Sequence, residues 1–594
     1  MTIEQWPNLV TMFFEQAAQH REQPFLWKKR DGYYQSQTWS DANARVTALA
    51  RGLIALGVEK GDRIVLVSEN RPAWPIADIA IMAAGAITTP AYTTNTAADH
   101  RHILGDSGAK GVIVSTAKLA EKVIEGAKGL NELAFIIVME GMPPRTGTPR
   151  VLRMADVLET GQARHENIAR MSEDIEPEET ACIIYTSGTG GTPKGVMLSH
   201  AAILHNCTGA LEALTDLGLG REVFLSFLPL SHSYEHTAGQ FFPIAIGAEI
   251  YYAEGVEALS VNMAEVHPTI MTAVPRLYEV LYQKIITGVT KSSGLKKWMF
   301  DKTLALGRKR YHAESFGPLD WLADKILDKL VRDKVRDRFG GRLKALVSGG
   351  APLNPEIGMF FTALGLTILQ GYGQTESAPV ISVNRAPDAR MHTVGRPVRD
   401  TEVRIADDGE ILVRGNLVMQ GYWNNETATR EAIRDGWLHT GDIGIFDENG
   451  HLLITDRKKD IIVNSGGDNI APQRVEGILN AEPEIAQSMV YGDKRPHLVC
   501  VVVPDQDWLT MWKRDNRKQG DLAALADDKE LHTALAPAFG RINKTLSNIE
   551  KVRRFIIANE PFSVDNNQMT PTMKVRRHVV RAVYGDRLEA LYKS

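Results

Sequence analysis

The sequence predicts an α/β protein with a large N-terminal domain of several subdomains and a small α+β C-terminal domain. Over residues 39–115, helix-like stretches alternate with short apolar runs, and this alternation returns over residues 180–370. Such alternation is typical of parallel sheets covered by helices. Over residues 395–455 the pattern changes to strand–turn–strand units, which indicates an antiparallel subdomain. The length, 594 residues, is too great for one compact core.

The first alternating region begins with the helix-like stretch SDANARVTALARGLIALG, which ends at Gly57. The apolar runs DRIVLVSE, GAITTPAY and GVIVS follow as expected strands. In the antiparallel subdomain, Asp408-Gly409 and Asn449-Gly450 predict the turns of two hairpins. Each element therefore has a local signal in the chain.

The C-terminal region begins with a change of pattern near Asp456. A helix with Pro472 near its start precedes two strands, SMVYGD and HLVCVVVPD, and polar helices are expected from there to the end of the chain. We assign residues 1–456 to the N-terminal domain, with the β subdomain at about 395–455, and residues 457–594 to the C-terminal domain.

A basic, helix-like insertion interrupts the second alternating region at about 284–342. Trp321, Leu322, Ile326, Leu330 and Val331 recur near helical spacing, and charged residues fill the positions between them. Two interpretations are open at this point. The insertion forms a pair of surface helices docked on the core, or it forms an amphipathic surface that approaches anionic lipid.

Composition excludes several classes of protein. A net charge of −4 and a pI near 6.5 provide no basic field for nucleic acid. The N-terminus lacks a basic segment followed by an apolar run, and no apolar stretch reaches the roughly 20 residues of a membrane-spanning helix. We therefore expect a cytoplasmic protein. The three cysteines are expected to be buried and unpaired.

The stretch ACIIYTSGTGGTPKGVMLSH, residues 181–200, predicts a phosphate-binding loop. An apolar strand leads into a loop made only of glycine and hydroxyl residues: Thr186, Ser187, Gly188, Thr189, Gly190 and Gly191. Glycine lets backbone N–H groups converge on phosphate oxygens, and Lys194 adds a positive charge. A Walker A loop is excluded, because Pro193 precedes the lysine and Gly195 follows it.

Residues 185–196 resemble the signature of the adenylate-forming superfamily, which comprises acyl-CoA synthetases, luciferases and peptide-synthetase adenylation domains. One departure is Gly190, where the superfamily usually has a second threonine. Further motifs follow in the order of the family. SGGAPL resembles the adenine-facing loop, with Gly349, Gly350, Ala351 and Pro352, and QGYGQTES resembles the next motif, with Gln370, Gly371, Tyr372, Gly373, Thr375 and Glu376.

The resemblance implies a role for each matching residue. Tyr372 stacks on adenine, Thr375 contacts the α-phosphate, and Glu376 binds Mg²⁺, with Thr186 as a second ligand. Asp442 and Arg457 hold the ribose, Lys459 is the hinge of a mobile C-terminal domain, and Gly466 and Gly467 meet the CoA arm. Lys574, in MTPTMKVRR, reaches the active site during adenylation, so that Lys574, Glu376, Thr186, Lys194 and His232 form the catalytic set.

By the same resemblance, the chain is an ATP-dependent fatty-acid–CoA ligase of the long-chain type. Its expected cofactors and co-substrates are ATP, Mg²⁺ and coenzyme A, and its partners are a fatty acid, a membrane surface in peripheral contact and a second copy in a homodimer. The alternatives are an aryl- or medium-chain-CoA ligase, a carrier-protein acyl ligase, and a catalytically inactive nucleotide- or lipid-binding protein.

A competing interpretation concerns the stretch HSYEH, residues 232–236, which has the H-x-x-E-H spacing of inverted zinc peptidases. The preceding FLSFLPL predicts a strand and a turn, and no third ligand stands out downstream. LPLSH also resembles a family motif near the acyl pocket, in which His232 shapes the carboxylate site. The family interpretation is therefore preferred over zinc.

Overall fold

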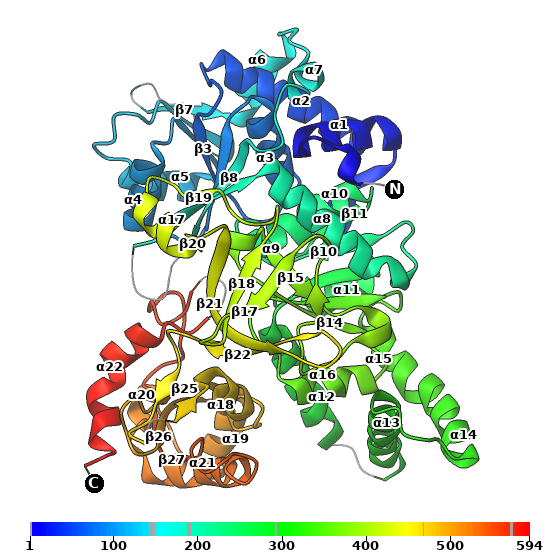
Figure 1. Cartoon of the computed structure of the whole chain (residues 1–594), viewed down its shortest axis with the longest axis vertical. Helices are drawn as coiled ribbons and strands as arrows, with labels where there is room; N and C mark the ends of the chain where they lie inside the picture. Colours follow the sequence, from blue (N-terminus) through cyan, green and yellow to red (C-terminus); the bar gives the residue numbers. More distant parts are fainter. Residues whose placement is uncertain are drawn as a thin grey trace.

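Two large sheets form the greater part of the protein (Figure 1). The computed structural model describes residues 3–141, 147, 149–186, 192–290, 294–466, 468–570 and 574–593. The first sheet has the order β19-β9-β8-β4-β3-β5-β6-β7. Its strands are β3 (Arg63–Val67), β4 (Ile87–Ala91), β5 (Gly111–Thr116), β6 (Phe135–Glu140), β7 (Arg150–Arg153), β8 (Thr180–Thr186), β9 (Lys194–Ser199) and β19 (Gly421–Tyr422).

The first sheet confirms the parallel arrangement that the alternation predicted. Strands β3 to β8 pair in parallel, whereas β9 and β19 add antiparallel strands at one edge. The connecting helices are α2 (Trp39–Ala55), α3 (Ala73–Ala83), α4 (Ala97–Ser107), α5 (Ala117–Gly126), α6 (Met154–Gln162) and α7 (Ile168–Ser172). Capping boxes begin α2 and α4, because Thr38 and Thr96 exchange hydrogen bonds with Asp41 and Asp99.

The second sheet has the order β16-β15-β14-β13-β12-β10-β11-β1-β2 and is parallel from β14 to β1. Its strands are β1 (Pro24–Arg30), β2 (Tyr33–Thr38), β10 (Val223–Ser226), β11 (Glu249–Tyr252), β12 (Ile270–Ala273), β13 (Ala345–Ser348), β14 (Ile368–Gly373), β15 (Val380–Val383) and β16 (Arg396–Pro397). The associated helices are α1 (Leu9–His20), α8 (His200–Leu214), α9 (Ser233–Glu235), the π-helix η3 (His236–Phe241), α10 (Phe242–Ala245), α11 (Leu259–Val266), α12 (Pro275–Thr290) and α16 (Pro355–Ala363). One apolar core joins the two sheets, since Leu66 and Ile184 of the first and Phe224 and Ile250 of the second belong to the same buried cluster.

The antiparallel subdomain contains both predicted hairpins. They are formed by β17 (Glu402–Ile405) with β18 (Glu410–Arg414), and by β21 (Trp437–Phe446) with β22 (Leu452–Arg457); β20 (Ile433–Arg434) completes the sheet, and α17 (Glu426–Ala432) precedes it. Gly409 and Gly450 lie in the turns with positive φ values of 83° and 78°, where a side chain is strained.

The C-terminal part has its own sheet and core. After the pair β23 (Ile462–Val463) and β24 (Asn469–Ile470), it contains α18 (Pro472–Leu479), β25 (Ile485–Tyr491), β26 (Leu498–Pro504), α19 (Gln506–Asp515), α20 (Leu522–Leu525), α21 (Lys529–Ile542), β27 (Val552–Ile557) and α22 (Arg577–Ala590). Cys500, Leu535 and Phe555 pack in a buried cluster of this part. All three cysteines are buried and unpaired, as predicted.

One C-terminal prediction is wrong, because the final region is not only helical. The run VRRFII forms β27, which pairs in parallel with β26. Two arginines break its apolar pattern, so the run is too short and too charged to be recognised from periodicity. Its last three residues are buried against the core only because β26 lies beside them.

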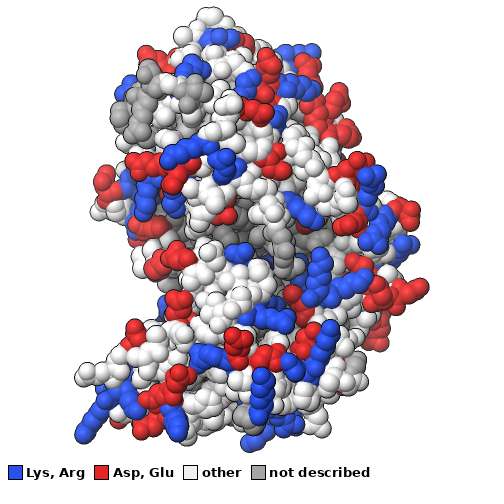
Figure 2. All heavy atoms as spheres, turned by 90° about the vertical axis from the view of Figure 1, so that its left-hand side faces the viewer, with Lys and Arg blue, Asp and Glu red and all other residues white. Residues whose placement is uncertain are grey.

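The basic insertion, predicted at about 284–342, begins inside α12 and then forms α13 (Leu295–Tyr311), α14 (Pro318–Leu327), the π-helix η4 (Asp328–Arg332) and α15 (Asp333–Arg338). In Figure 1, α13 and α14 occupy the lower right corner of the molecule, away from the C-terminal part. Within the described ranges, no helix is both long and apolar enough to cross a bilayer. Acidic and basic side chains are interspersed over the face that Figure 2 shows.

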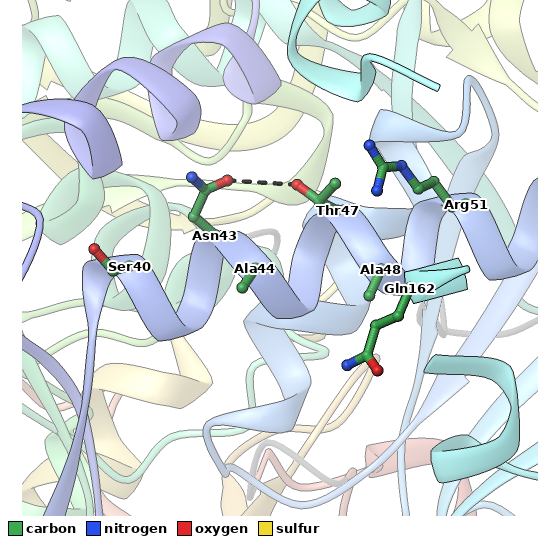
Figure 3. A pocket seen from close by; sticks show the side chains of 7 residues that line it. All are labelled: Ser40, Asn43, Ala44, Thr47, Ala48, Arg51 and Gln162. Carbon is green, nitrogen blue, oxygen red and sulfur yellow. Dashed lines mark hydrogen bonds between the residues drawn. The ribbon is translucent and has the colours of Figure 1, made fainter. Parts of the chain in front are cut away.

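A pocket of about 320 Å³ is lined mainly by residues of α2 (Figure 3). Asn43, Thr47 and Arg51 line it from α2, and Gln162 lines it from α6; Thr47 Oγ1 donates to Asn43 Oδ1 at 3.5 Å. The pocket contains no residue that the sequence predicted for the functional site. The candidate site therefore lies elsewhere.

Candidate active site

The predicted phosphate loop connects β8 to β9, so it joins strand to strand as expected. Thr186 ends β8 and pairs with Lys194 at the start of β9. The five residues between positions 186 and 192, predicted to bind phosphate, lie outside the described residues. The ammonium of Lys194 is exposed and lies 4.9 Å from the centre of the Tyr422 ring, in a cation–π contact.

Tyr372, Asp442 and Arg457 form a hydrogen-bonded cluster. Tyr372 Oη donates to Asp442 Oδ2 at 2.7 Å, and Arg457 Nε donates to Asp442 Oδ1 at 3.0 Å. Asp442 and Arg457 are directly opposite in the β21–β22 ladder, while Tyr372 comes from the end of β14. Burial, with the charge of Asp442, raises the pKa of Tyr372 well above its ordinary value, so this phenol stays protonated and donates.

Glu376 and Thr375 follow β14 in a single 3₁₀ turn, Thr375–Ser377. Tyr422 Oη donates to Glu376 Oε1 at 2.8 Å. The hydroxyl groups of Thr375 and Ser233 lie 3.1 Å apart, which connects this turn to α9. The Glu376 carboxylate, which the Tyr422 phenol orients, and the buried Thr375 hydroxyl are therefore adjacent in the sequence, at the carboxyl end of β14.

His232 lies at the N-terminus of α9, where its Nδ1 accepts a hydrogen bond from the Tyr234 amide at 3.2 Å. Burial and the charge of Lys574 lower the pKa of His232 to about 3. The imidazole is thus neutral at physiological pH. Because Nδ1 accepts, the proton resides on Nε2, which is free to act as a donor.

Lys574 meets this cluster from the C-terminal part. Although the residue as a whole is exposed, protein surrounds its ammonium group. This desolvation, together with Arg457, lowers the pKa of Lys574 to about 8, while the carboxylates of Asp442 and Glu376 oppose the decrease. The structure therefore brings Lys574 to the residues predicted to bind ribose and metal.

The segment around Lys574 is held by local and long-range contacts. The Lys574 amide donates to Thr570 Oγ1 at 3.0 Å, and the Thr570 amide donates to the Lys574 carbonyl at 2.8 Å. Elsewhere, Arg276 Nη1 and Gln283 Nε2 of α12 donate to the carbonyls of Ala486 and Ala481, each at 3.0 Å. The C-terminal part is thus docked on α12 in the arrangement that presents Lys574.

Several glycines of the motifs are required by close approach. A Cβ at Gly373 would lie 1.8 Å from the carbonyl oxygen of Pro379, and one at Gly349 would lie 3.0 Å from the Tyr234 ring. Gly350 has φ of 80°. Ala351 and Pro352 are exposed on the same loop, and Gln370 and Gly371 lie in β14. Close approach therefore excludes a side chain at Gly373 and crowds one at Gly349.

Two predicted residues, Lys459 and Gly466, make no contact with this cluster among the described residues. Lys459 is exposed in the turn that follows β22. Gly466 is exposed in the turn between β23 and β24, where its amide donates to Asn464 Oδ1 at 2.8 Å. Gly467 lies outside the described residues.

The side chains of the HSYEH stretch have separate partners. Glu235 accepts from Ser226 Oγ at 2.6 Å and from Thr272 Oγ1 at 2.5 Å, whereas His236 Nε2 is 2.8 Å from Asp78 Oδ2. Burial raises the pKa of Glu235 to about 7. The pKa of His232 is lowered by burial and by the charge of Lys574 instead. The three side chains therefore serve different parts of the structure, as the family interpretation requires.

Two site residues, Tyr422 and Ser233, were not predicted. Tyr422 contacts both Lys194 and Glu376 but lies in the two-residue strand β19, which carries no motif. Ser233 is adjacent to His232, and its position beside Thr375 depends on the approach of α9 to β14. Only the adjacency of Ser233 to LPLSH offered a signal in the sequence.

Comparison with known proteins identifies the family. The sequence model of the AMP-binding enzyme family matches residues 13–423, and that of the AMP-binding enzyme C-terminal domain matches residues 459–594. A long-chain-fatty-acid–CoA ligase, FadD15, from Mycobacterium bovis is 35% identical over 100% of this chain and 98% of its own length. The long chain acyl-CoA synthetase 6 of Arabidopsis thaliana is 31% identical over 95% of this chain and 82% of its own.

Solved structures share the fold. The adenylation domain of a carboxylic acid reductase from Segniliparus rugosus, in complex with AMP and a co-purified carboxylic acid, superposes with a TM-score of 0.78 at 20% identity, covering 99% of this chain and 94% of that one. A benzoate CoA ligase from Burkholderia xenovorans gives 0.71 at 22% identity, covering 97% and 99%. Fold and site together define an adenylate-forming enzyme. The chain belongs to the AMP-binding enzyme family.

Proposed function

We propose that this protein is an ATP-dependent fatty-acid–CoA ligase, which forms an acyl-adenylate with release of pyrophosphate and then an acyl-CoA with release of AMP. The observation that carries the proposal is the approach of Lys574, from the C-terminal part, to Glu376, Asp442 and Arg457. Two cationic side chains, Lys574 and Arg457, therefore lie near two carboxylates, Glu376 and Asp442. A nucleotide with charged phosphates and a polar ribose fits this arrangement.

In the first half-reaction, a fatty carboxylate attacks the α-phosphorus of ATP. Asp442 and Arg457 hold the ribose, and Tyr372 forms the wall for adenine. The ammonium of Lys574 offsets the negative charge that develops as the P–O bond to pyrophosphate breaks. His232 is neutral and donates from Nε2, so it can orient the attacking carboxylate through a hydrogen bond.

Two of the predicted site residues, Glu376 and Thr186, suit a magnesium ion. Glu376 offers a carboxylate held by Tyr422, and Thr186 offers a hydroxyl, both of which are oxygen ligands that Mg²⁺ prefers. When bound, the ion would neutralise phosphate charge. Lys194, whose ammonium lies 4.9 Å from the centre of the Tyr422 ring, adds a positive charge.

In the second half-reaction, the thiolate of CoA attacks the acyl carbon and AMP departs. We infer that the C-terminal domain, residues 457–594, rotates about Lys459, withdraws Lys574 and presents Gly466 and Gly467. The exposed turn at Lys459 and the few hydrogen bonds between α12 and the C-terminal part support this rotation.

A cavity of about 470 Å³ supports a location for the anionic end of CoA. It lies beyond the ends of β3, β4, β10 and β11. Lys28, Lys29, Arg71 and Ser231 contribute to its lining, together with the carboxylates Glu69 and Glu254, and Arg71 is paired with Glu69 and Glu140. Lys29 is paired with Glu254 and Glu265. No carboxylate lies within 4 Å of the Lys28 ammonium in the part of the chain described, and burial with Arg71 lowers the pKa of Lys28. A phosphate group would compensate this charge.

The proposal extends to the substrate of the enzyme and to its location in the cell. The relatives named long-chain ligases favour a long-chain fatty acid, with aryl and medium-chain acids as the alternatives. We place the enzyme in the cytoplasm, in peripheral contact with a membrane and with homodimerisation as a further expectation.

The test is a panel of carboxylic acids, from acetate to oleate together with aromatic acids, read by pyrophosphate release and then by AMP formation with CoA. We expect the highest kcat/KM for long-chain acids. Lys574→Ala should abolish adenylation and spare thioester formation from supplied acyl-adenylate. Equal loss of both half-reactions would refute the assignment, and absence of AMP with every acid would identify a binding protein without catalysis.

A further inference from the structure

The basic insertion exposes an unusual amount of apolar surface. Seven of the sixteen large apolar side chains that are exposed among the described residues lie between positions 295 and 330. Leu295 and Trp298 belong to α13, whereas Leu319, Trp321, Leu322, Ile326 and Leu330 belong to α14 and η4. Concentration of exposed apolar side chains on one projecting element marks an interaction surface.

The apolar side chains of α14 are arranged as a stripe. Leu319, Leu322 and Ile326 recur at intervals of three and four residues, with Leu330 four residues further, and they are 83%, 52%, 50% and 44% exposed. Leu327 and Asp324 point the other way and are each 3% exposed. The helix thus packs on the protein with one face and presents a second apolar face outward, which we call the α14 face.

The charges around the α14 face are divided between its two sides. The acidic residues are held on the protein side: Asp320 pairs with Lys302 and Lys309, Asp324 with Arg332, and Asp328 with Arg336. On the outer side, Lys325 and Lys329 are exposed, and neither lies within 4 Å of a described carboxylate; the Lys325 ammonium lies 4.0 Å from the centre of the Trp321 ring. The outward surface therefore combines apolar side chains with uncompensated positive charge.

The charge balance identifies the partner. Residues 284–342 contain fifteen Lys and Arg against seven Asp and Glu, a net charge of +8 in a chain whose net charge is −4. A second copy of the same face would meet it with like charge, which disfavours self-association there. A partner with an anionic surface and an apolar interior fits both the positive charge and the exposed apolar side chains of the insertion. Tryptophan and lysine side chains suit the boundary between such a surface and such an interior.

We propose that the α14 face docks the protein on the surface of an anionic lipid bilayer. Leucine and isoleucine side chains would enter the boundary of the acyl chains, while Lys325 and Lys329 lie against lipid phosphates. The inference rests on the proposed function only for the reason why docking is useful. A fatty acid partitions into the bilayer, and docking brings the enzyme to it. Docking itself is measurable without turnover.

The experiment is co-sedimentation of the full-length protein with vesicles of phosphatidylcholine alone or mixed with phosphatidylglycerol. We expect binding to the mixed vesicles that decreases with added salt, as screening predicts. The change K325Q with K329Q should weaken partitioning about 30-fold, since each lysine near an anionic surface contributes about 1 kcal/mol. Leu322→Ser with Ile326→Ser should weaken it at least about tenfold by removing apolar contact.

The matched control is Val256→Ser with Val261→Ser, which removes equally exposed apolar side chains, 63% and 56% exposed, outside the insertion. This variant should bind vesicles like the parent. With a water-soluble short-chain acid and no vesicles, every variant should retain the parental rate of pyrophosphate release; with a long-chain acid supplied in vesicles, only the insertion variants should be slower. If the proposed function is wrong, neither the parent nor any variant should turn over the acid, whereas vesicle binding should be unchanged.

Three outcomes would overturn the proposal. Equal binding of the parent and the insertion variants to anionic vesicles would place docking elsewhere. Equal binding to neutral and anionic vesicles would remove the role of the lysines. A dimer in light scattering that Leu322→Ser with Ile326→Ser converts to a monomer, without a change in vesicle binding, would identify a second copy as the occupant.

Discussion

Titration of Lys574 provides the sharpest test of the site. Its pKa is about 8, lowered from the ordinary value of 10.5 by surrounding protein and by Arg457. The charged ammonium is the form that stabilises the departing phosphate, and it is present below the pKa and lost above it. The kcat/KM for adenylation should therefore fall about tenfold for each pH unit above about 8.

The assay is pyrophosphate release in the absence of CoA, followed over a range of pH. The kcat/KM profile reports the free enzyme, so its alkaline limb should lie near the pKa of Lys574. The limb in kcat should lie at higher pH, because bound ATP phosphates favour the ammonium. Arg457→Gln removes a positive neighbour and should move the kcat/KM limb upward, apart from any loss of ATP affinity.

Two measurements distinguish titration of Lys574 from other causes of an alkaline decrease in kcat/KM. Lys574→Arg keeps its charge over the whole range, so its residual adenylation should lack the alkaline limb. Thioester formation from supplied acyl-adenylate should instead rise with pH, because the CoA thiol, with a pKa near ~8.5, attacks as thiolate. A flat kcat/KM profile for the parent across this range, or the same limb in Lys574→Arg, would refute the assigned role.

Four further variants, one of them a control, test other parts of the site. Tyr422→Phe removes the hydrogen bond to Glu376 and should reduce adenylation about tenfold, as expected for a bond to a charged group, while thioester formation from acyl-adenylate is unchanged; loss of both would indicate misfolding. Lys28→Met should raise the KM for CoA at least about fivefold and leave that for ATP unchanged, whereas Lys29→Met, which removes an already paired lysine, should have little effect on either; the same KM shift in both would reject the cavity. Lys459→Pro should slow thioester formation and spare pyrophosphate release, and an unaltered overall rate would argue against the hinge.

The sequence by itself determined the fold class and predicted most of the candidate site residues. Alternating helices and apolar runs predicted the parallel sheets, and the Asp-Gly and Asn-Gly pairs predicted the hairpins, because these signals depend on a few neighbouring residues. The run VRRFII shows the limit of such signals. It becomes β27 only because β26 offers it a partner.

Only the tertiary structure decided how the site residues affect one another. The sequence could match Lys574 and Asp442 to motifs, but the pKa of Lys574 depends on which charges and how much protein surround its ammonium. Tyr422 acquires its contact with Glu376 because β19 pairs with β9 across more than two hundred residues of chain. Likewise, the apolar spacing of α14 left two interpretations open, and only burial showed which face turns outward. Spacing along a chain fixes local structure, whereas electrostatics and burial depend on distances in space that only the folded chain sets.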